Sequence, residues 1–441
     1  MVFKELFKKI IPATILSAYH LMLAWVAAVW YRFPSRRLIV IGVTGTKGKS
    51  TTSFFITKLL ETLGESVGLS GTIMFKVGRR EWPNTLKMTM PGRFRLQRLL
   101  RDMVRAGCAF AVIETTSEGI AQHRHRGIDY DVLVFTNLSP EHIERHGSFE
   151  AYKRAKQSLF QNLHRSFHKN LFFHKQVRRI LKVIVVNRDD PHFAGFVQFS
   201  ADQHVAVSLC DTAAAIFARD VISNDSGNTF TVADQHFTLS LLGDFNVMNA
   251  LLTLAVGAVF DFSLEHMRLA LAKLPQIPGR MQRIDGGQDF TVIVDYAHEP
   301  KSMEALFRNA KRLRKNPQSR IITLISSTGG GRDVARRPML GKLAGGYADI
   351  VIVTDEDPYD EDPNVIMQAV ARGVVEAGKI LGQTFFIFQD RKEAIFEAIR
   401  LARSGDVVLL PAKGSERVMA VAHNTHIPWS DEAIAREALK K

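Results

Sequence analysis

Short apolar segments alternate with amphipathic segments along most of the chain. In the first half, the apolar segments have the length and β-branched content of buried strands, and the segments between them carry apolar residues at helical spacing. This alternation predicts a parallel sheet covered by helices. The predicted strands are 37–43, 110–115, 132–138 and 182–187, and the predicted helices include 91–106 and 149–164.

The pattern changes in residues 201–241, where short strand-like pieces are separated by Asn, Asp and Gly. This pattern predicts a small antiparallel β insert. Its pieces are 204–209, 228–233 and 236–242. A helix is expected over 247–260, and the prolines and glycine of 274–280 indicate a domain boundary. The basic stretch 164–181 is interpreted as a solvated helix face.

A second alternation of strands and helices follows that boundary, with polar loops after the strands. It predicts a Rossmann-like unit whose ligand loops lie at the carboxyl ends of its strands. The predicted strands are 290–296, 320–326, 349–355, 384–389 and 406–412, and the predicted helices are 301–314, 337–347, 363–381 and 391–403. The fold class is therefore α/β, with a P-loop-type parallel-sheet core, a small β insert and a Rossmann-like C-terminal domain. The predicted domains are 1–36, 37–279 and 280–441.

The stretch GVTGTKGKSTT at 42–52 directly follows the first predicted strand. A glycine-rich turn that opens a helix presents backbone N–H groups to phosphates, so this stretch predicts ATP binding. Lys49 would neutralise the β- and γ-phosphates, and Ser50 or Thr51 would hold Mg²⁺. The strict P-loop spacing requires glycine where Val43 stands. The predicted nucleotide contacts are Gly45, Thr46, Lys47, Gly48, Lys49, Ser50 and Thr51.

The N-terminal segment 10–31 contains no Asp, Glu, Lys or Arg and is long enough to cross a bilayer. Its small and polar residues fall near one helical face, however, which is typical of a helix packed on protein or lying in an interface. These residues are Thr14, Ser17, His20, Ala24 and Ala27. The pattern favours packing on the protein over membrane association. We therefore expect a cytoplasmic location, with the inner face of the membrane as the alternative.

Composition restricts the functional classes only partly. The 441 residues carry a formal charge of +14, which suits phosphorylated substrates as well as nucleic acid or anionic lipid. The two cysteines, Cys108 and Cys210, have no disulfide or zinc spacing, and this favours a reducing compartment.

Ten motifs, in order along the chain, resemble those of the Mur ligases, and above all the muramoyl-tripeptide synthetase branch. The motifs are GTKGKSTT, IETTSEG, TNLSPEHIERHG, YKRAKQSLF, VVNRDDPHF, LLGDFNVMNA, PGRMQRI, DYAHEP, GGGRD and PAKGSE. The resemblance spans about residues 38–431, and it implies an ATP-dependent ligase that activates a carboxylate as an acyl phosphate for attack by an amino acid. It also implies small-molecule substrates, a muramoyl-peptide-type acceptor and no nucleic-acid partner.

The resemblance assigns the catalytic positions to Lys49, Glu114, His142 and Lys156. Ser50, Glu114 and His142 would be Mg²⁺ ligands. Lys156 matches the lysine that this family carbamylates; without the family match it would be interpreted as a surface helix lysine.

Further contacts also follow only from the resemblance. They are Asn249 near the adenine, Arg280 near the phosphates, Asp295 near the ribose, and Thr116, Ser117, Asp357, Tyr359 and Glu416 near the substrates. In the family's diaminopimelate-adding branch, an Asp-Asn-Pro-Arg loop binds the distal carboxylate, whereas this chain has Glu-Asp-Pro-Tyr at 356–359. The acidic loop 355–362 favours an amino acid that ends in an ammonium group, such as lysine or ornithine. A solvated acidic turn is the alternative.

Two departures from the family pattern concern the acceptor. Only the apolar segment precedes the ATP core, so we expect the N-terminal uridine-nucleotide domain of the family to be missing. In addition, the loop 114–118 reads Glu-Thr-Thr-Ser-Glu where the family has Glu-Val-Ser-Ser-His. The alternative hypotheses are a ligase for another carboxylate, as in folylpolyglutamate or cyanophycin synthesis, and a degenerate membrane-attached ligase that acts as a binding module.

Overall fold

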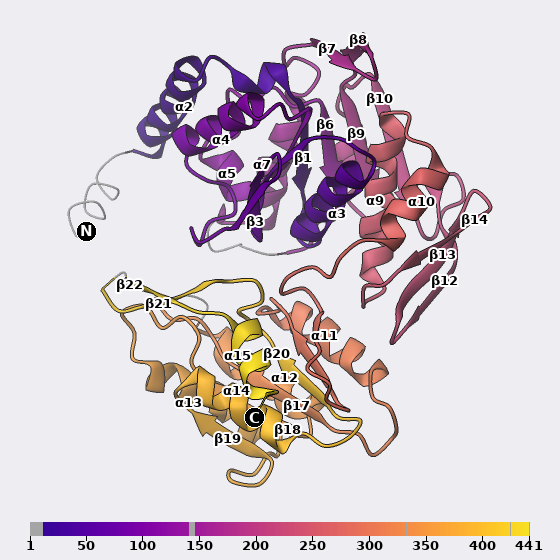
Figure 1. Cartoon of the computed structure of the whole chain (residues 1–441). Coiled ribbons are helices and arrows are strands. Elements are labelled where there is room, and N and C mark those ends of the chain that lie inside the picture. The colour runs from indigo at the N-terminus through magenta and orange to yellow at the C-terminus, as the bar shows by residue number, and fades with distance from the viewer. Residues whose placement is uncertain (1–11, 141–145, 332–333, 424, 441) are drawn as a thin grey trace. The chain divides into compact units, whose positions relative to one another are not determined.

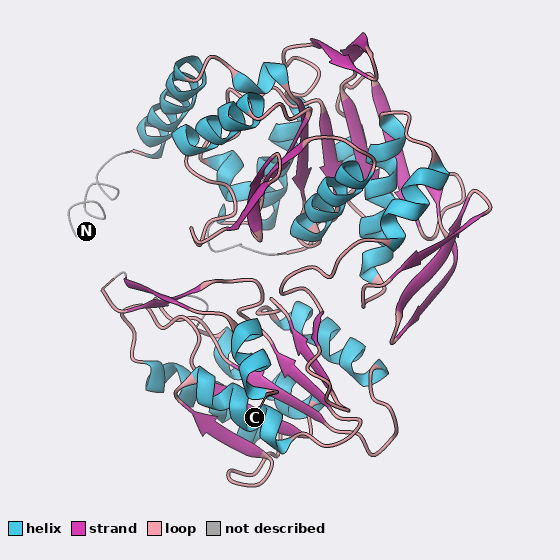
Figure 2. Cartoon of the chain, viewed as in Figure 1, coloured by secondary structure: helices cyan, strands magenta, loops and turns pink. Residues whose placement is uncertain are grey.

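The computed structural model describes residues 12–140, 146–331, 334–423 and 425–440. The chain forms two compact units. The first contains most of the chain up to Leu274, and the second contains the chain from Pro275 onward together with the short pieces Ser223–Gly227 and Ser240–Gly243. Figure 1 gives the element labels, and Figure 2 shows that helices cover the main sheet of each unit.

The first unit is built on a sheet of nine strands within the described residues, in the order β11-β10-β9-β6-β1-β5-β2-β3-β4. The strands from β11 to β2 pair in parallel, and β3 and β4 extend the sheet in antiparallel fashion. The strands are β1 Ile39–Thr44, β2 Val67–Ser70, β3 Met74–Val77, β4 Arg80–Pro83, β5 Phe110–Glu114, β6 Val132–Phe135, β9 Val183–Asn187, β10 Gln203–Ser208 and β11 Ile216–Phe217.

Strands β1, β5, β6 and β9 are buried along their whole length. Burial on both faces explains why these segments read as continuous apolar runs. Helices α4 and α7 contribute to the core on one face of the sheet, and α3, α9 and α10 pack together on the other (Figure 1). The helices are α3 Lys49–Thr62, α4 Arg93–Arg105, α5 Ser117–Ala121, α7 Phe149–Gln161, α8 Ala194–Val197, α9 Phe245–Val259 and α10 Leu264–Ala272.

Two predictions for this unit were wrong. The piece 204–209 does not belong to the antiparallel insert, because β10 pairs in parallel with β9 and extends the main sheet. The insert is the three-stranded sheet β12 Arg219–Asn224, β13 Gly227–Val232 and β14 Gln235–Leu239. The basic stretch 164–181 is not a helix face but an antiparallel hairpin of β7 Lys169–Phe173 and β8 Gln176–Ile180. Lys169 of this hairpin is buried and forms an ion pair with Asp131 of the core. This positive charge of the basic stretch is therefore neutralised inside the protein rather than exposed to solvent.

Helix α2, Ala13–Trp30, contacts α4, and the C-terminal part of the predicted small-residue face is buried, whereas Thr14 is exposed. Ala24, Ala27 and Ala28 are buried, and Ser17 Oγ lies 2.8 Å from His123 Nε2. A Cβ atom at Gly127 would lie 2.5 Å from Cβ of Ala28, so this close approach depends on glycine. The short 3-10 helix η1, Pro34–Arg37, then leads into β1. No helix in the described part of the chain has both the length and the apolar content needed to cross a bilayer.

The second unit has a six-stranded sheet in the described residues, in the order β15-β16-β20-β17-β18-β19, and only β15 is antiparallel. Alternate residues of its strands enter two separate apolar cores: Ile293 faces one core, and Val292 and Val294 face the other. The strands are β15 Gln282–Ile284, β16 Thr291–Val294, β17 Ile321–Ile325, β18 Ile350–Thr354, β19 Phe385–Phe388 and β20 Val407–Leu410. The remaining elements are α11 Pro300–Arg312, α12 Arg336–Tyr347, α13 Pro363–Glu376, α14 Arg391–Leu401, α15 Asp431–Ala438 and the hairpin β21 Val418–Val421 with β22 Thr425–Pro428.

Candidate active site

The glycine-rich loop of the first unit connects β1 to the N-terminus of α3. Gly48 is the N-cap residue of α3 and has a φ of 78°, a conformation that strains residues with a side chain. A Cβ atom there would also lie 2.6 Å from Oδ1 of Asn249. At Gly45, a Cβ atom would lie 1.9 Å from Oγ1 of Thr136. Both positions therefore require glycine, and the helix N-terminus stays accessible to an anion.

The loop that follows β6 holds the glycine-rich loop in place. The backbone N–H of Lys47 donates to Oδ1 of Asn137 over 2.8 Å, and that of Thr46 donates to the Asn137 carbonyl over 2.9 Å. The Thr136 hydroxyl donates to the Lys47 carbonyl over 2.6 Å. Because β6 is the parallel neighbour of β1, its carboxyl end brings these groups beside the loop.

Two lysine side chains reach the same carbonyl of the glycine-rich loop. Nζ of Lys49 donates to the carbonyl oxygens of Gly45 and Thr46, over 2.9 and 2.7 Å. Nζ of Lys156, which is buried, donates to the Gly45 carbonyl over 2.8 Å and lies 4.7 Å from the centroid of the Tyr152 ring. Interpreting Lys156 as a surface lysine would thus be wrong. The Lys49 amine beside the loop suits a polyphosphate.

Glu114 lies at the end of β5, in register with Val43 of β1. Its Oε1 accepts from the Ser50 hydroxyl over 2.8 Å, and its Oε2 accepts from the Thr72 backbone N–H and hydroxyl over 2.8 and 2.9 Å. The carboxylate and the Ser50 hydroxyl are hard oxygen donors side by side, and so they fit Mg²⁺. The third predicted ligand, His142, lies outside the described residues.

The remaining predicted residues of this unit occupy nearby positions. Asn249, on α9, accepts from the Thr52 hydroxyl of α3 over 3.1 Å and thereby lies next to the glycine-rich loop. Thr116 is the N-cap residue of α5, and its hydroxyl accepts from the Gly119 N–H. The Ser117 hydroxyl lies 3.1 Å from Nε2 of His146.

In the second unit, three loops at the carboxyl edge of the sheet converge. A Cβ atom at Gly279 would lie 2.0 Å from the Ser415 nitrogen, and this shows how closely the 278–280 loop approaches the 412–415 loop. Asp295, after β16, accepts from the backbone N–H groups of Met281 and Ala297, over 2.6 and 2.7 Å. Burial raises the pKa of Asp295, while Arg280 acts in the opposite direction.

A buried lysine connects the loops after β18 and β20. Nζ of Lys413 donates to Oδ1 of Asp357 over 2.9 Å, to Oε2 of Glu416 over 2.6 Å and to the Val418 carbonyl over 3.0 Å. The two carboxylates raise the pKa of Lys413 against the effect of its burial. The structure thus brings the predicted substrate residues Asp357 and Glu416 together through a residue to which the sequence analysis gave no role.

Comparisons with known proteins place both units in one family. The Mur ligase middle domain matches residues 43–257, and the Mur ligase glutamate ligase domain matches residues 279–414. The chain belongs to the Mur ligase family. It is therefore an ATP-dependent, amide-bond-forming ligase of peptidoglycan synthesis.

Individual relatives of this Mur ligase cover nearly its whole length. A UDP-N-acetylmuramyl-tripeptide synthetase of Roseiflexus sp. (strain RS-1) is 41% identical over 97% of this chain and 84% of its own length. A UDP-N-acetylmuramoyl-L-alanyl-D-glutamate--2,6-diaminopimelate ligase of Geobacillus kaustophilus (strain HTA426) is 36% identical over 98% of this chain and 85% of its own length. A solved structure of a diaminopimelate ligase of the same name has a TM-score of 0.61 and 30% identity, covering 92% of this chain and 78% of its own.

Three residues of this Mur ligase contact residues of the candidate site although the sequence analysis did not assign them. Thr72 donates twice to Glu114, Asn137 fixes the glycine-rich loop, and Lys413 joins two acidic residues. Thr72 and Asn137 follow β2 and β6, strands of the parallel sheet, and Lys413 follows β20. Each of these residues follows a parallel strand, and this position in the sequence could have identified them as candidate site residues.

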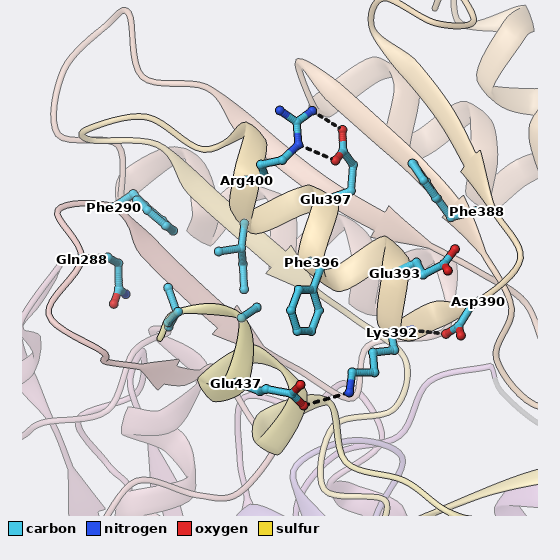
Figure 3. Close-up of a pocket in the computed structure, with 13 residues that line it drawn as sticks. Gln288, Phe290, Phe388, Asp390, Lys392, Glu393, Phe396, Glu397, Arg400 and Glu437 are labelled. Carbon is cyan, nitrogen blue, oxygen red and sulfur yellow. Dashed lines mark hydrogen bonds and ion pairs between the residues drawn. The ribbon is translucent and has the colours of Figure 1, made fainter. Parts of the chain in front are cut away.

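A pocket of the second unit lies beside α14 and α15 (Figure 3). Phe290, Phe396 and Leu439 contribute apolar surface to it, and a 2.9 Å ion pair between Lys392 and Glu437 bridges the two helices at its edge. None of the predicted site residues in the described part of the chain lines this pocket. It is therefore separate from the candidate active site.

Proposed function

We propose that this Mur ligase adds an amino acid that ends in an ammonium group, such as lysine or ornithine, to a muramoyl-peptide-type carboxylate. In this reaction a carboxylate oxygen of the acceptor attacks the γ-phosphorus of ATP and ADP leaves. The α-amine then attacks the acyl phosphate, and phosphate leaves as the amide forms. The proposal combines the phosphate-binding geometry of the first unit with the acidic loop of the second.

The phosphate chemistry is supported by the residues around the glycine-rich loop. Lys49 places positive charge where the transferred phosphoryl group would be held, and the α3 N-terminus adds backbone N–H groups. Ser50 and Glu114 would hold Mg²⁺, which when bound neutralises phosphate charge. The Thr72 contacts keep the Glu114 carboxylate oriented toward Ser50.

Carbamylation of Lys156 belongs to the same proposal. The side chain is enclosed, and its Nζ lies beside the Gly45 carbonyl, next to the loop that would receive the phosphates. Carbamylation would convert this amine into an anionic oxygen ligand. Mass spectrometry of intact protein equilibrated with ¹³C-bicarbonate tests this step. A Lys156→Met control should lose the label, whereas label retained in that variant would contradict the assignment.

Four acidic side chains of loop 355–362 already have structural partners. Asp357 pairs with Lys413, Glu361 pairs with Arg337 over 2.6 Å, and Asp360 accepts from the His423 N–H. Asp362 caps α13. Asp357 and Glu361 are thus neutralised by cations, and Asp360 and Asp362 are exposed. The first two residues of the loop are less exposed, and within the described part of the chain their carboxylates accept only from the Glu356 N–H and the Ser326 hydroxyl, so they are the candidates for binding a substrate ammonium group.

Those two residues are Asp355 and Glu356. Burial raises the pKa of Asp355 to about 6, and burial and the neighbouring Asp357 raise the pKa of Glu356. A cation placed beside them would favour their ionised forms and be attracted by them. The observation that carries the amino-acid assignment is this partly buried acidic pair, together with Tyr359 where the diaminopimelate-adding branch has arginine.

The test is an ADP-release assay that crosses lysine, ornithine and meso-diaminopimelate with UDP-linked and uridine-free muramoyl dipeptides, with Lys49→Ala as the blank. We expect kcat/KM for lysine or ornithine to exceed that for diaminopimelate by about tenfold or more. A preference for diaminopimelate would overturn the amino-acid assignment. No ADP release with any combination would overturn the acceptor class.

A matched pair of variants isolates the acidic pair. Asp355→Asn should raise the KM for the ammonium-bearing amino acid while leaving the KM for ATP unchanged. Asp360→Asn makes the same chemical change at an exposed position of the same loop and should alter neither value. Equal effects of both variants would show that the loop acts only through its structure.

A further inference from the structure

Helix α2 exposes a continuous row of large apolar side chains. Ile15, Met22, Val26 and Val29 are spaced by seven, four and three residues and so lie on one face of the helix, and all four are exposed. Tyr19 and Trp30 extend the row, and Trp30 is 74% exposed. We call these six residues the α2 stripe. Soluble proteins rarely expose an apolar row of this extent unless it binds something.

The α2 stripe is held in a fixed direction. The opposite face of the helix carries Ala24, Ala27 and Ala28, which are buried against the protein beside Gly127. The helix is also tied by Ser17 to His123. Because the small residues form the packed face, the large residues point away from the protein.

The neighbouring surface is strongly basic. Helix α4, which contacts α2, contains five arginines and one acidic residue. Arg95, Arg98 and Arg105 are exposed, and so are Arg32 and Arg37 just beyond the end of α2. Figure 1 shows α2 and α4 side by side at the outer edge of the first unit. The helix that contacts α2, and the chain just beyond the end of α2, thus carry exposed positive charge.

We propose that the α2 stripe and the arginines of α4 dock this enzyme on the surface of a bilayer that contains anionic lipid. The stripe would enter the boundary between headgroups and acyl chains, with α2 lying parallel to the surface. The arginines would contact the anionic headgroups. Amphipathic helices bind membranes with this combination of apolar insertion and positive charge, and Trp and Tyr favour that depth.

Charge decides between lipid and a second copy of the chain. A symmetric dimer through the α2 stripes would bring two copies of the basic α4 surface together, and the chain has a formal charge of +14. Like charges that face each other oppose association. An anionic bilayer covers the apolar stripe and also neutralises the arginines, so it matches both features of the surface.

Vesicle flotation of the full-length chain tests the proposal. We expect binding to vesicles of phosphatidylcholine with about 30 mol% phosphatidylglycerol, and about tenfold weaker binding to pure phosphatidylcholine vesicles. Raising the salt to about 0.5 M should weaken binding to the anionic vesicles. The double variant Val26→Glu/Val29→Glu should reduce that binding by about tenfold or more, because it places two carboxylates in the inserted face.

The control is Val365→Glu/Val375→Glu, which changes two exposed valines of α13 in the other unit. It should bind vesicles like the unchanged chain, and both double variants should keep the far-UV circular dichroism and the Tm. Failure to float with anionic vesicles, or equal binding by the α2 variant, would overturn the proposal. So would sedimentation equilibrium showing a dimer that the α2 variant abolishes, because the stripe would then bind a second copy. The test uses no substrate, so its outcome is independent of the proposed amino acid and acceptor.

Discussion

Replacing Glu114 by glutamine removes one charge from the candidate metal site while keeping its shape. The carboxylate accepts three hydrogen bonds, one from Ser50 and two from Thr72. In Glu114→Gln, the amide oxygen can keep both Thr72 donors, and the Ser50 hydroxyl can rotate to accept from the new N–H. Hydrogen bonds to a charged group contribute about 1 kcal/mol more than neutral ones, so the exchange weakens three contacts. Removing a buried charge offsets part of that loss. We therefore expect the free energy of unfolding to fall by only about 1–2 kcal/mol.

Activity should respond much more strongly than stability. An anionic metal ligand stabilises phosphoryl transfer throughout the reaction, and losing one such electrostatic contact typically costs about 10²–10³ in kcat. The measurements are ADP release at saturating substrates and urea denaturation of the same preparation. Glu81→Gln is the control, since Glu81 is ion-paired with Lys58 and Lys76 in the same unit, away from the glycine-rich loop. If Glu114→Gln kept kcat within about threefold of the unchanged enzyme, Glu114 would not be a ligand of the Mg²⁺ that neutralises the reacting phosphates.

Three further predictions concern single positions. Lys413→Met leaves Asp357 and Glu416 without their buried cation and should lower the free energy of unfolding by about 3–5 kcal/mol, measured in urea, whereas Lys413→Arg should lose less. The pKa of Asp355 is raised by burial to about 6, so the folded chain holds this proton more tightly than the unfolded chain. Stability should therefore fall as the pH rises from about 4 to 6, and Asp355→Asn should flatten this fall in urea titrations across that range. Gly48→Ala forces a side chain into a left-handed conformation and against the α9 asparagine, so it should cost at least about 1–2 kcal/mol and abolish ADP release; unchanged Tm and activity would refute the loop geometry.

The sequence determined the central strands of both parallel sheets closely, because these strands are buried on both faces. Continuous apolar runs such as 110–115 and 349–355 are stable only when they are buried, and they form the buried strands β5 and β18. Neighbouring parallel strands also end at the same edge of a sheet. For that reason Glu114, at the end of its strand, could be expected near the glycine-rich loop. The family motifs then supplied roles that spacing alone could not.

Tertiary structure decided how individual polar residues and segments are used. The apolar, charge-free segment before β1 left packing and membrane contact both open, and only the folded chain shows small residues buried and large ones exposed. The apolar alternation of 204–209 suits an antiparallel edge as well as a parallel one, and contact with β9 selected the latter. Lys156 has the sequence context of a surface lysine and is nevertheless buried against the Gly45 carbonyl. The local sequence pattern determines which residues are buried and whether a segment has the period of a helix or a strand. The partner of a long polar side chain, by contrast, can lie more than a hundred positions away in the sequence, as it does for Lys156 and Gly45. Only the folded chain brings such residues within contact distance.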